Sequence, residues 1–305
     1  MSERQQHLDG LALVVLLSCC SIWGLAQVAA KLTLAEVPPL LQAGLRSAGA
    51  AVLLLLWSRW RGLRVFDADG SGRAGLLAGA MFAVEFACLF VGLQFTTASR
   101  MSVFLYLAPF VVALGMPLIS PGERLSGRQA LGLVLAFGGV VWAFAEGFVR
   151  PAAGPLQWLG DALGMAAAVL WAGTTLVVRA TRLASALPEK TLLYQLAVSG
   201  VALTAASALS AEVWPRQVSA PVALLMLFQI AVVTFGSYLA WFWLVRHYPA
   251  TRVSAFTLLT PLLGLLAGVG LLGDPLTLRL AVALLAVCGG IAIVNLAPRP
   301  AGAQP

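Results

Sequence analysis

Charged residues are scarce in this sequence, and their scarcity excludes a soluble fold. Only 10% of the 305 residues are Asp, Glu, Lys or Arg, whereas soluble domains carry about 25%. With 60% hydrophobic residues and a mean hydropathy of +0.93, the chain has more apolar surface than a soluble core of this size can bury. Most of the chain must therefore contact lipid, and we expect an all-α polytopic membrane protein.

Residues that could support enzyme chemistry are equally few. The chain has two histidines, His7 and His247, and no HExxH pattern, which argues against a zinc protease. It also has no GxxxxGKS loop for ATP and no aspartate in the middle of an apolar run, which aspartyl intramembrane proteases need. The four cysteines lie inside apolar runs without metal spacing. We expect no enzyme activity, no cofactor and no metal.

The net charge of +7 reflects membrane topology and gives no support for a nucleic-acid partner, because the basic residues lie singly between apolar runs. If the N-terminus is cytoplasmic, 13 of the 19 Lys and Arg residues fall on the inside, 5 fall outside, and Arg46 lies within a span. The excess of basic residues on the inside predicts that both termini are cytoplasmic.

Ten apolar runs are long enough to cross a bilayer, which takes about 20 residues per helix. They cover roughly residues 11–33, 39–58, 74–94, 100–119, 126–145, 158–180, 190–210, 221–244, 250–273 and 276–296. We assign residues 1–150 and 151–297 to two five-helix repeats and residues 298–305 to a disordered tail.

An internal duplication supports this division. The stretch Ala98–Pro109, ASRMSVFLYLAP, returns 152 residues later as Ala250–Pro261, ATRVSAFTLLTP, with six identities in twelve positions. Five spans per repeat is an odd number, so the second copy enters the membrane from the opposite side. Inverted repeats of this kind are typical of secondary transporters, whose binding site lies near the midplane between the halves.

The ordered motifs resemble the EamA domain of the drug/metabolite transporter superfamily over nearly the whole chain. The resemblance is carried by Leu107-Ala-Pro109, Gly122-Glu123-Arg124-Leu125 and Gly138-Gly139, by their echoes Leu259-Thr-Pro261, Gly273-Asp274-Pro275-Leu276 and Gly289-Gly290, and by Trp23-Gly24 and Lys31 in the first span. It implies a ten-helix inner-membrane exporter of amino acids, other metabolites or drugs. Two departures are Asp274-Pro275 in place of Glu123-Arg124, and Ser199 near the position that corresponds to Arg46.

Glu85 is the carboxylate that lies in the middle of a span. Placing a charge there costs roughly 2.5–3.5 kcal/mol on insertion scales, so Glu85 should face protein or a watery cavity. It could bind a substrate ammonium, carry a proton, or form a structural ion pair with Arg46, which lies at a similar depth. These interpretations are compatible, because a substrate can break an ion pair that lines a cavity.

A polar and aromatic stripe recurs on the first helix of each repeat. Trp23 and Gln27 share one helix face with Lys31, and Trp171 and Thr175 repeat the spacing ahead of Arg179. The two Trp residues lie mid-span, away from the interfacial belt where Trp is common. We predict that Trp23, Gln27, Trp171 and Thr175 line a central cavity, with core packing as the alternative for the Trp pair.

Three further aromatic residues suit an amphipathic ligand, because each combines an apolar ring with a polar tip. They are Tyr106, Tyr238 and Trp241. Pro109 and Pro261 should kink spans four and nine near the midplane, where they could act as gating points or simply improve packing.

Together these patterns predict a secondary transporter that exports a small organic metabolite, such as an amino acid, by alternating access. The expected partners are a small-molecule substrate, the lipid bilayer and coupling protons, with a monomer or homodimer as the assembly. The alternatives are a multidrug efflux carrier, which differs in cavity selectivity, and a lipid-handling membrane protein. The last would need clustered acids, His or Ser-centred triads at one membrane surface, and the sequence has none.

Overall fold

The computed structural model describes residues 8–120, 125–143, 145, 154–264, 266 and 278–296. Within these ranges the chain is helical with short connections and contains no β-strand. The predicted repeat boundary at residue 150, the tail from residue 298, and the Glu123-Arg124 and Asp274-Pro275 motifs lie outside the described residues. The all-α prediction is confirmed for the rest.

The first half consists of five apolar segments. They are α1 (Gly10–Thr33), α2 (Pro39–Trp60), α3 (Gly72–Phe95), the broken pair α4 (Ala98–Leu105) and α5 (Ala108–Ile119), and α6 (Gly127–Ala143). The second half follows the same order. It comprises α8 (Gln157–Ala180), the short 3₁₀ turn η2 (Arg182–Ala184), α9 (Pro188–Leu209), the composite segment α10 (Ala220–Leu227), η3 (Phe228–Ser237) and α11 (Tyr238–His247), then α12 (Ala250–Phe256) with η4 (Thr257–Leu259), and α14 (Leu278–Leu296).

Six segments in the described part of the chain are long and apolar enough to span a membrane, and shorter apolar helices accompany them. Their outer faces carry large apolar side chains that no protein covers, for example Leu56, Leu118 and Leu209. A soluble protein rarely exposes so much contiguous apolar surface, so these faces meet lipid. The protein is therefore a polytopic membrane protein.

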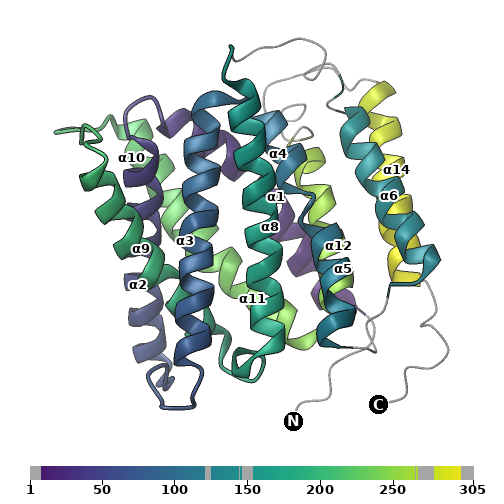
Figure 1. The fold of residues 1–305 in the computed structure, drawn as a ribbon, viewed down its shortest axis with the longest axis horizontal. Coiled ribbons are helices and arrows are strands. Elements are labelled where there is room, and N and C mark those ends of the chain that lie inside the picture. Colours follow the sequence, from purple (N-terminus) through teal and green to yellow (C-terminus); the bar gives the residue numbers. More distant parts are fainter. Residues whose placement is uncertain are drawn as a thin grey trace.

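Equivalent helices pair with each other in the two halves, although counterpart contacts differ in extent. The equivalent helices α2 and α9 pack together, as do α6 and α14, which lie along each other at one edge of the bundle (Figure 1). Helix α3 packs on α8, and its counterpart contact is that of α1 with η3. This pattern is what a pseudo-two-fold axis between inverted repeats requires.

Helices α2 and α9 approach each other closely because small residues lie at their crossing. A Cβ added to Gly44 would stand 2.8 Å from the Thr204 backbone nitrogen, and one added to Gly200 would stand 3.0 Å from that of Ala48. Because the hydrophobic effect does not drive helices together in lipid, they associate through van der Waals packing, and small residues at the crossing allow the close approach that this packing needs.

Spans four and nine are interrupted, where the sequence predicts kinks. Helix α4 ends at Leu105, and α5 begins at Ala108 with Pro109 in its first turn. The second half repeats this arrangement, since the 3₁₀ turn η4 precedes the helical residues 260–264, which contain Pro261. Proline is tolerated in a first helical turn because the missing N–H has no partner there in any case.

The connections at residues 61–71 and 181–187 lie at the same end of the bundle (Figure 1). The start of α1 lies at this end too, and we call it the Asp9 end. The opposite end, where α3 finishes and α8 begins, we call the Asp161 end.

Candidate functional site

A cavity lies between the two halves, with about 80 Å³ open to the centres of water molecules. A single water needs roughly 10–15 Å³ of such space, so the cavity holds several waters or a small organic molecule. All eight side chains predicted to bind substrate line it, and Arg46 joins them. These nine residues are Trp23, Gln27, Arg46, Glu85, Tyr106, Trp171, Thr175, Tyr238 and Trp241. Whether they bind substrate stays a prediction.

Helix α1 reaches the cavity because it crosses the second half at very short range. A Cβ added to Gly24 would lie 2.8 Å from both the Gly264 nitrogen and the Thr260 oxygen. This approach places Trp23 and Gln27 on the cavity wall, as their shared helix face predicts. Lys31, at the end of the same helix, donates to the backbone oxygens of Leu93 and Thr96 at the end of α3.

The aromatic wall is centred on Trp23. Its ring centroid lies 6.0 Å from those of Trp171 and Tyr238 and 5.3 Å from that of Trp241, in edge-on arrangements. Tyr106 adds a further contact with Trp171 at 5.9 Å. Such pairs are worth about 0.5–1.5 kcal/mol each beyond the area they bury. The indole N–H of Trp23 donates to the Ser237 hydroxyl at 2.7 Å, which fixes the ring.

Arg46 is held by aromatic faces. Its guanidinium carbon lies 4.1 Å from the centroid of the Phe86 ring, 5.1 Å from that of Phe90 and 5.7 Å from that of Tyr238. One terminal nitrogen also donates to the Tyr238 hydroxyl at 3.4 Å. Cation–π contacts of a desolvated guanidinium are worth about 2 kcal/mol, so the rings stabilise the charge within the membrane.

Glu85 lies beside this arrangement, and the described residues give it no hydrogen bond or ion pair. Only 4% of its surface is exposed, and its Oε2 atom accepts no hydrogen bond. No ion pair within 4.0 Å joins it to Arg46, although both side chains line the same cavity. A structural ion pair between them would need a side-chain movement and stays a prediction. A buried polar atom without a partner costs about 1–3 kcal/mol, and more when it is charged.

Sequence reasoning missed Gln195, which also lines the cavity. This side chain is fully buried, and neither its amide nitrogen nor its amide oxygen has a hydrogen-bond partner. Helices α2 and α9 both begin with a proline, Pro39 and Pro188, which sets an offset of 149 residues between the repeats. At this offset Gln195, and not Ser199, is the residue equivalent to Arg46. Ser199 instead bonds the backbone oxygen of Leu196 at 3.3 Å. Aligning the two prolines would have identified Gln195 from the sequence.

Other lining residues were also missed, among them Thr174, Phe82 and Phe86. The Thr174 hydroxyl is buried without a partner, like the Oε1 atom of Gln27. Phe82, Phe86 and Phe90 share one face of α3 at a spacing of four residues. This spacing is also that of ordinary helix packing, so only the tertiary arrangement shows that the face meets the cavity.

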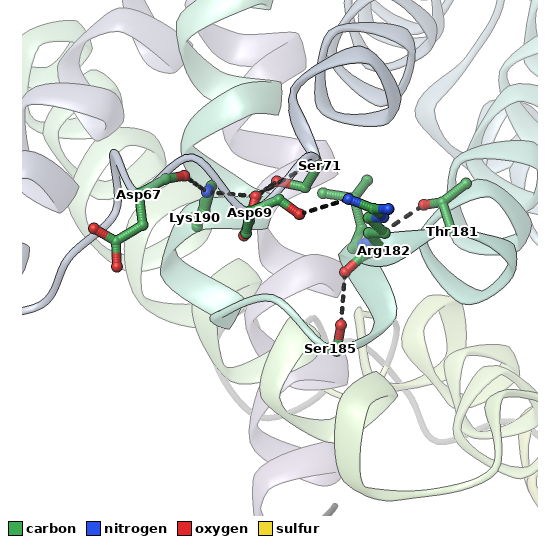
Figure 2. A network of polar contacts seen from close by, with 8 residues as sticks. Asp67, Asp69, Ser71, Thr181, Arg182, Ser185 and Lys190 are labelled. Atoms are coloured by element: carbon green, nitrogen blue, oxygen red, sulfur yellow. Dashed lines mark hydrogen bonds and ion pairs between the residues drawn. The ribbon is translucent and has the colours of Figure 1, made fainter.

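The two halves are connected at the Asp9 end by a polar network (Figure 2). Lys190 of α9 forms an ion pair with Asp69 at 2.8 Å and donates to the Asp67 backbone oxygen at 2.5 Å, while Arg182 donates to the backbone oxygen of Asp69. Hydrogen bonds from Lys190 and Ser71 hold the pKa of the Asp69 carboxyl well below its usual range. At the Asp161 end, hydrogen bonds from Ser219 lower the pKa of Glu36.

The described residues contain no group of three or more His, Cys, Asp or Glu side chains placed to hold a metal ion. The four cysteines are free thiols. The chemistry available to the site is therefore that of one carboxylate, one guanidinium, neutral amides and hydroxyls, and aromatic faces.

Comparisons with known proteins agree with this architecture. A model of the EamA-like transporter family matches residues 10–145 and 158–296. The uncharacterized transporter YvbV of Bacillus subtilis (strain 168) is 28% identical over 277 residues, which cover 90% of this chain and 88% of the relative. An uncharacterized transporter of Archaeoglobus fulgidus is 30% identical over 282 residues, covering 87% and 92%. One solved crystal structure superposes with a TM-score of 0.73 at 20% identity, covering 93% of this chain and 96% of the other.

Proposed function

The chain belongs to the EamA-like transporter family, and from this premise we propose that it is a secondary transporter exporting a small organic metabolite. It would bind its substrate, an amino acid or a similar amphipathic molecule, in the cavity between the halves. Export would run across the cell (inner) membrane with both termini in the cytoplasm, the orientation that the distribution of Lys and Arg favours.

The observation that carries this proposal is the convergence of polar atoms without partners on one cavity at the interface of the halves. Arg46 Nε, Glu85 Oε2, Thr174 Oγ1 and both amide atoms of Gln195 are buried, lack hydrogen bonds and belong to cavity-lining residues. Native structures retain few such atoms, and each needs an explanation. Polar groups of a bound solute, or the waters it replaces, would supply the missing bonds.

The inverted architecture supports alternating access as the proposed mechanism. Because equivalent helices have equivalent neighbours in the two halves, a second conformation in which each half adopts the arrangement of the other would keep these neighbours. It would open the cavity to the other side of the membrane. Protons are the proposed coupling ion, with Glu85 as the group that would carry them.

Counterflow in proteoliposomes tests the proposal. Purified protein is reconstituted and supplied with pooled labelled amino acids, sugars, nucleosides and drugs, with and without a pH gradient. The Glu85→Gln variant is compared with Asp67→Asn, a matched control whose carboxylate is exposed on the loop at the Asp9 end.

We expect counterflow of at least one pool by the wild type and by Asp67→Asn. Loss of gradient-driven accumulation in Glu85→Gln, with exchange retained, would identify Glu85 as the proton site. Exchange of many unrelated drugs would identify a multidrug efflux carrier. An absence of counterflow for every pool would contradict the proposal and favour the lipid-handling alternative.

A further inference from the structure

The two charged side chains in the cavity, Arg46 and Glu85, differ in their contacts with the rest of the protein. Arg46 rests on aromatic faces, with its guanidinium carbon 4.1 Å from the Phe86 centroid, and donates to Tyr238. Glu85 has no such partner among the described residues, and its Oε2 atom is buried and unbonded. The charge left for a ligand to neutralise is therefore the negative one.

We propose that the substrate is an organic cation, an amine with a compact apolar body and no carboxylate. This inference rests on the proposed transport function and narrows its substrates to amines, which excludes amino acids. The ammonium group of the substrate would donate to Glu85 Oε2 and to Gln27 Oε1. The Gln27 oxygen is a second buried acceptor that has no hydrogen-bond partner and belongs to a residue lining the same cavity. An ammonium carries several donors and no acceptor, which matches these two atoms.

The aromatic wall favours the same class of ligand. Trp23, Trp171, Trp241 and Tyr238 present rings to the cavity, and aromatic faces attract ammonium groups, most strongly when the ligand has lost its water. These rings line the same cavity as the Glu85 carboxylate. The combination suits an amine that has an apolar body and a single positive charge.

A substrate carboxylate has a poorer site in this cavity. Arg46 is the basic side chain that lines it, among the residues the structure describes. A carboxylate would have to compete with the Tyr238 hydroxyl and draw the guanidinium away from Phe86 and Phe90. It would also bring a second negative charge into the space that Glu85 lines.

Phenethylamine and phenylalanine test the proposal, because they differ only by the carboxylate. Binding is measured as the rise in melting temperature of the detergent-solubilised protein, and transport as counterflow in proteoliposomes. Wild type, Glu85→Gln and the loop control Asp67→Asn are compared. We expect phenethylamine to bind at least tenfold more tightly than phenylalanine, and Glu85→Gln to remove this preference while Asp67→Asn retains it.

The two readouts separate this proposal from the proposed function. Phenethylamine binding that depends on Glu85, without counterflow, would support the cation site and contradict the carrier. Counterflow of phenylalanine or of other pools, with no binding of phenethylamine, would support the carrier and overturn the cation site. Equal binding of both compounds by wild type and Glu85→Gln would also overturn it.

Discussion

The two halves of the cavity share one backbone plan and differ in charge. Arg46 in the first half corresponds to Gln195 in the second, through the matching starts of α2 and α9. Glu85 corresponds to Ser237 at the offset of 152 set by the repeated stretch. Both charged residues thus come from the first half, and their counterparts are a neutral amide and a hydroxyl.

In the proposed mechanism, the similar backbone of the two halves allows the conformational change, and their different side chains determine which ligand binds. Exchange of conformations needs similar packing in the two halves, which the small residues at the α2–α9 crossing provide. A substrate that is smaller than the whole interface cannot use two identical binding groups, so the chemistry can concentrate on one half. Four variants measure how unequal the halves are.

Glu85→Gln should have the largest effect. It removes a charge-assisted hydrogen bond, worth about 1.5–3 kcal/mol, so the half-saturating concentration of the exchanged solute should rise roughly 10- to 100-fold. Concentration-dependent counterflow measures this change, with protein folding checked by size-exclusion chromatography. A change below twofold would mean that the first half does not dominate binding.

Arg46→Gln makes the first half resemble the second and should lower the melting temperature, while the affinity for an organic cation should stay the same or rise. The substitution removes the cation–π contacts with Phe86 and Phe90, which are worth about 2 kcal/mol, and takes away the positive charge nearest Glu85. Thermal unfolding and counterflow are measured together. Arg46→Lys should recover little, because an ammonium lacks the flat face that stacks on a ring.

Gln195→Met tests the neutral half and should reduce affinity roughly 2- to 10-fold, the range expected for a neutral hydrogen bond of about 0.5–1.5 kcal/mol. The side chain keeps its length but loses both amide atoms, which have no protein partner. Counterflow kinetics under the same conditions give the comparison. A loss as large as that of Glu85→Gln would show that the two halves contribute equally.

Asp69→Asn should have the smallest effect and should spare substrate affinity, because this contact between the halves lies outside the cavity. The lowered pKa of Asp69 means that its stabilising contribution is fully present above the pKa of the unfolded chain, about 3.9. The contribution is lost as the pH falls through the lower native value. The melting temperature of the wild type should exceed that of Asp69→Asn by a constant amount between pH 5 and 8, and the difference should shrink below pH 4.

The sequence predicted the framework well because apolar runs determine where helices lie in lipid. Helix α1 covers residues 10–33 against a predicted 11–33, and α8 covers 157–180 against 158–180. The cavity residues Trp23 and Trp171 could be identified because mid-span Trp is unusual and the pair recurs in the repeat. These are local or periodic signals, and such signals can be read without a structure.

Features that depend on neighbours distant in the sequence could not be predicted in this way. The place of Arg46 on the Phe86 and Phe90 rings depends on how α2 meets α3. Gln195 is a different case, because it was missed when Ser199 was placed near the position of Arg46, and alignment of Pro39 with Pro188 corrects this from the sequence. The breaks before Pro109 and Pro261 were predicted as kinks, since proline indicates where a helix is disturbed and tertiary packing decides how far.

The π-helix η3 determines the direction in which the side chains that follow it point around the helix axis. Its hydrogen bonds reach five residues along the chain instead of four, so residues 228–237 turn more slowly about the helix axis than α-helical residues would. The direction of everything beyond it, including Tyr238 and Trp241, depends on this slower turn. If the same residues formed an α-helix instead, α11 would be rotated about its axis and its aromatic face would move off the cavity, although every side chain of α11 would still be present.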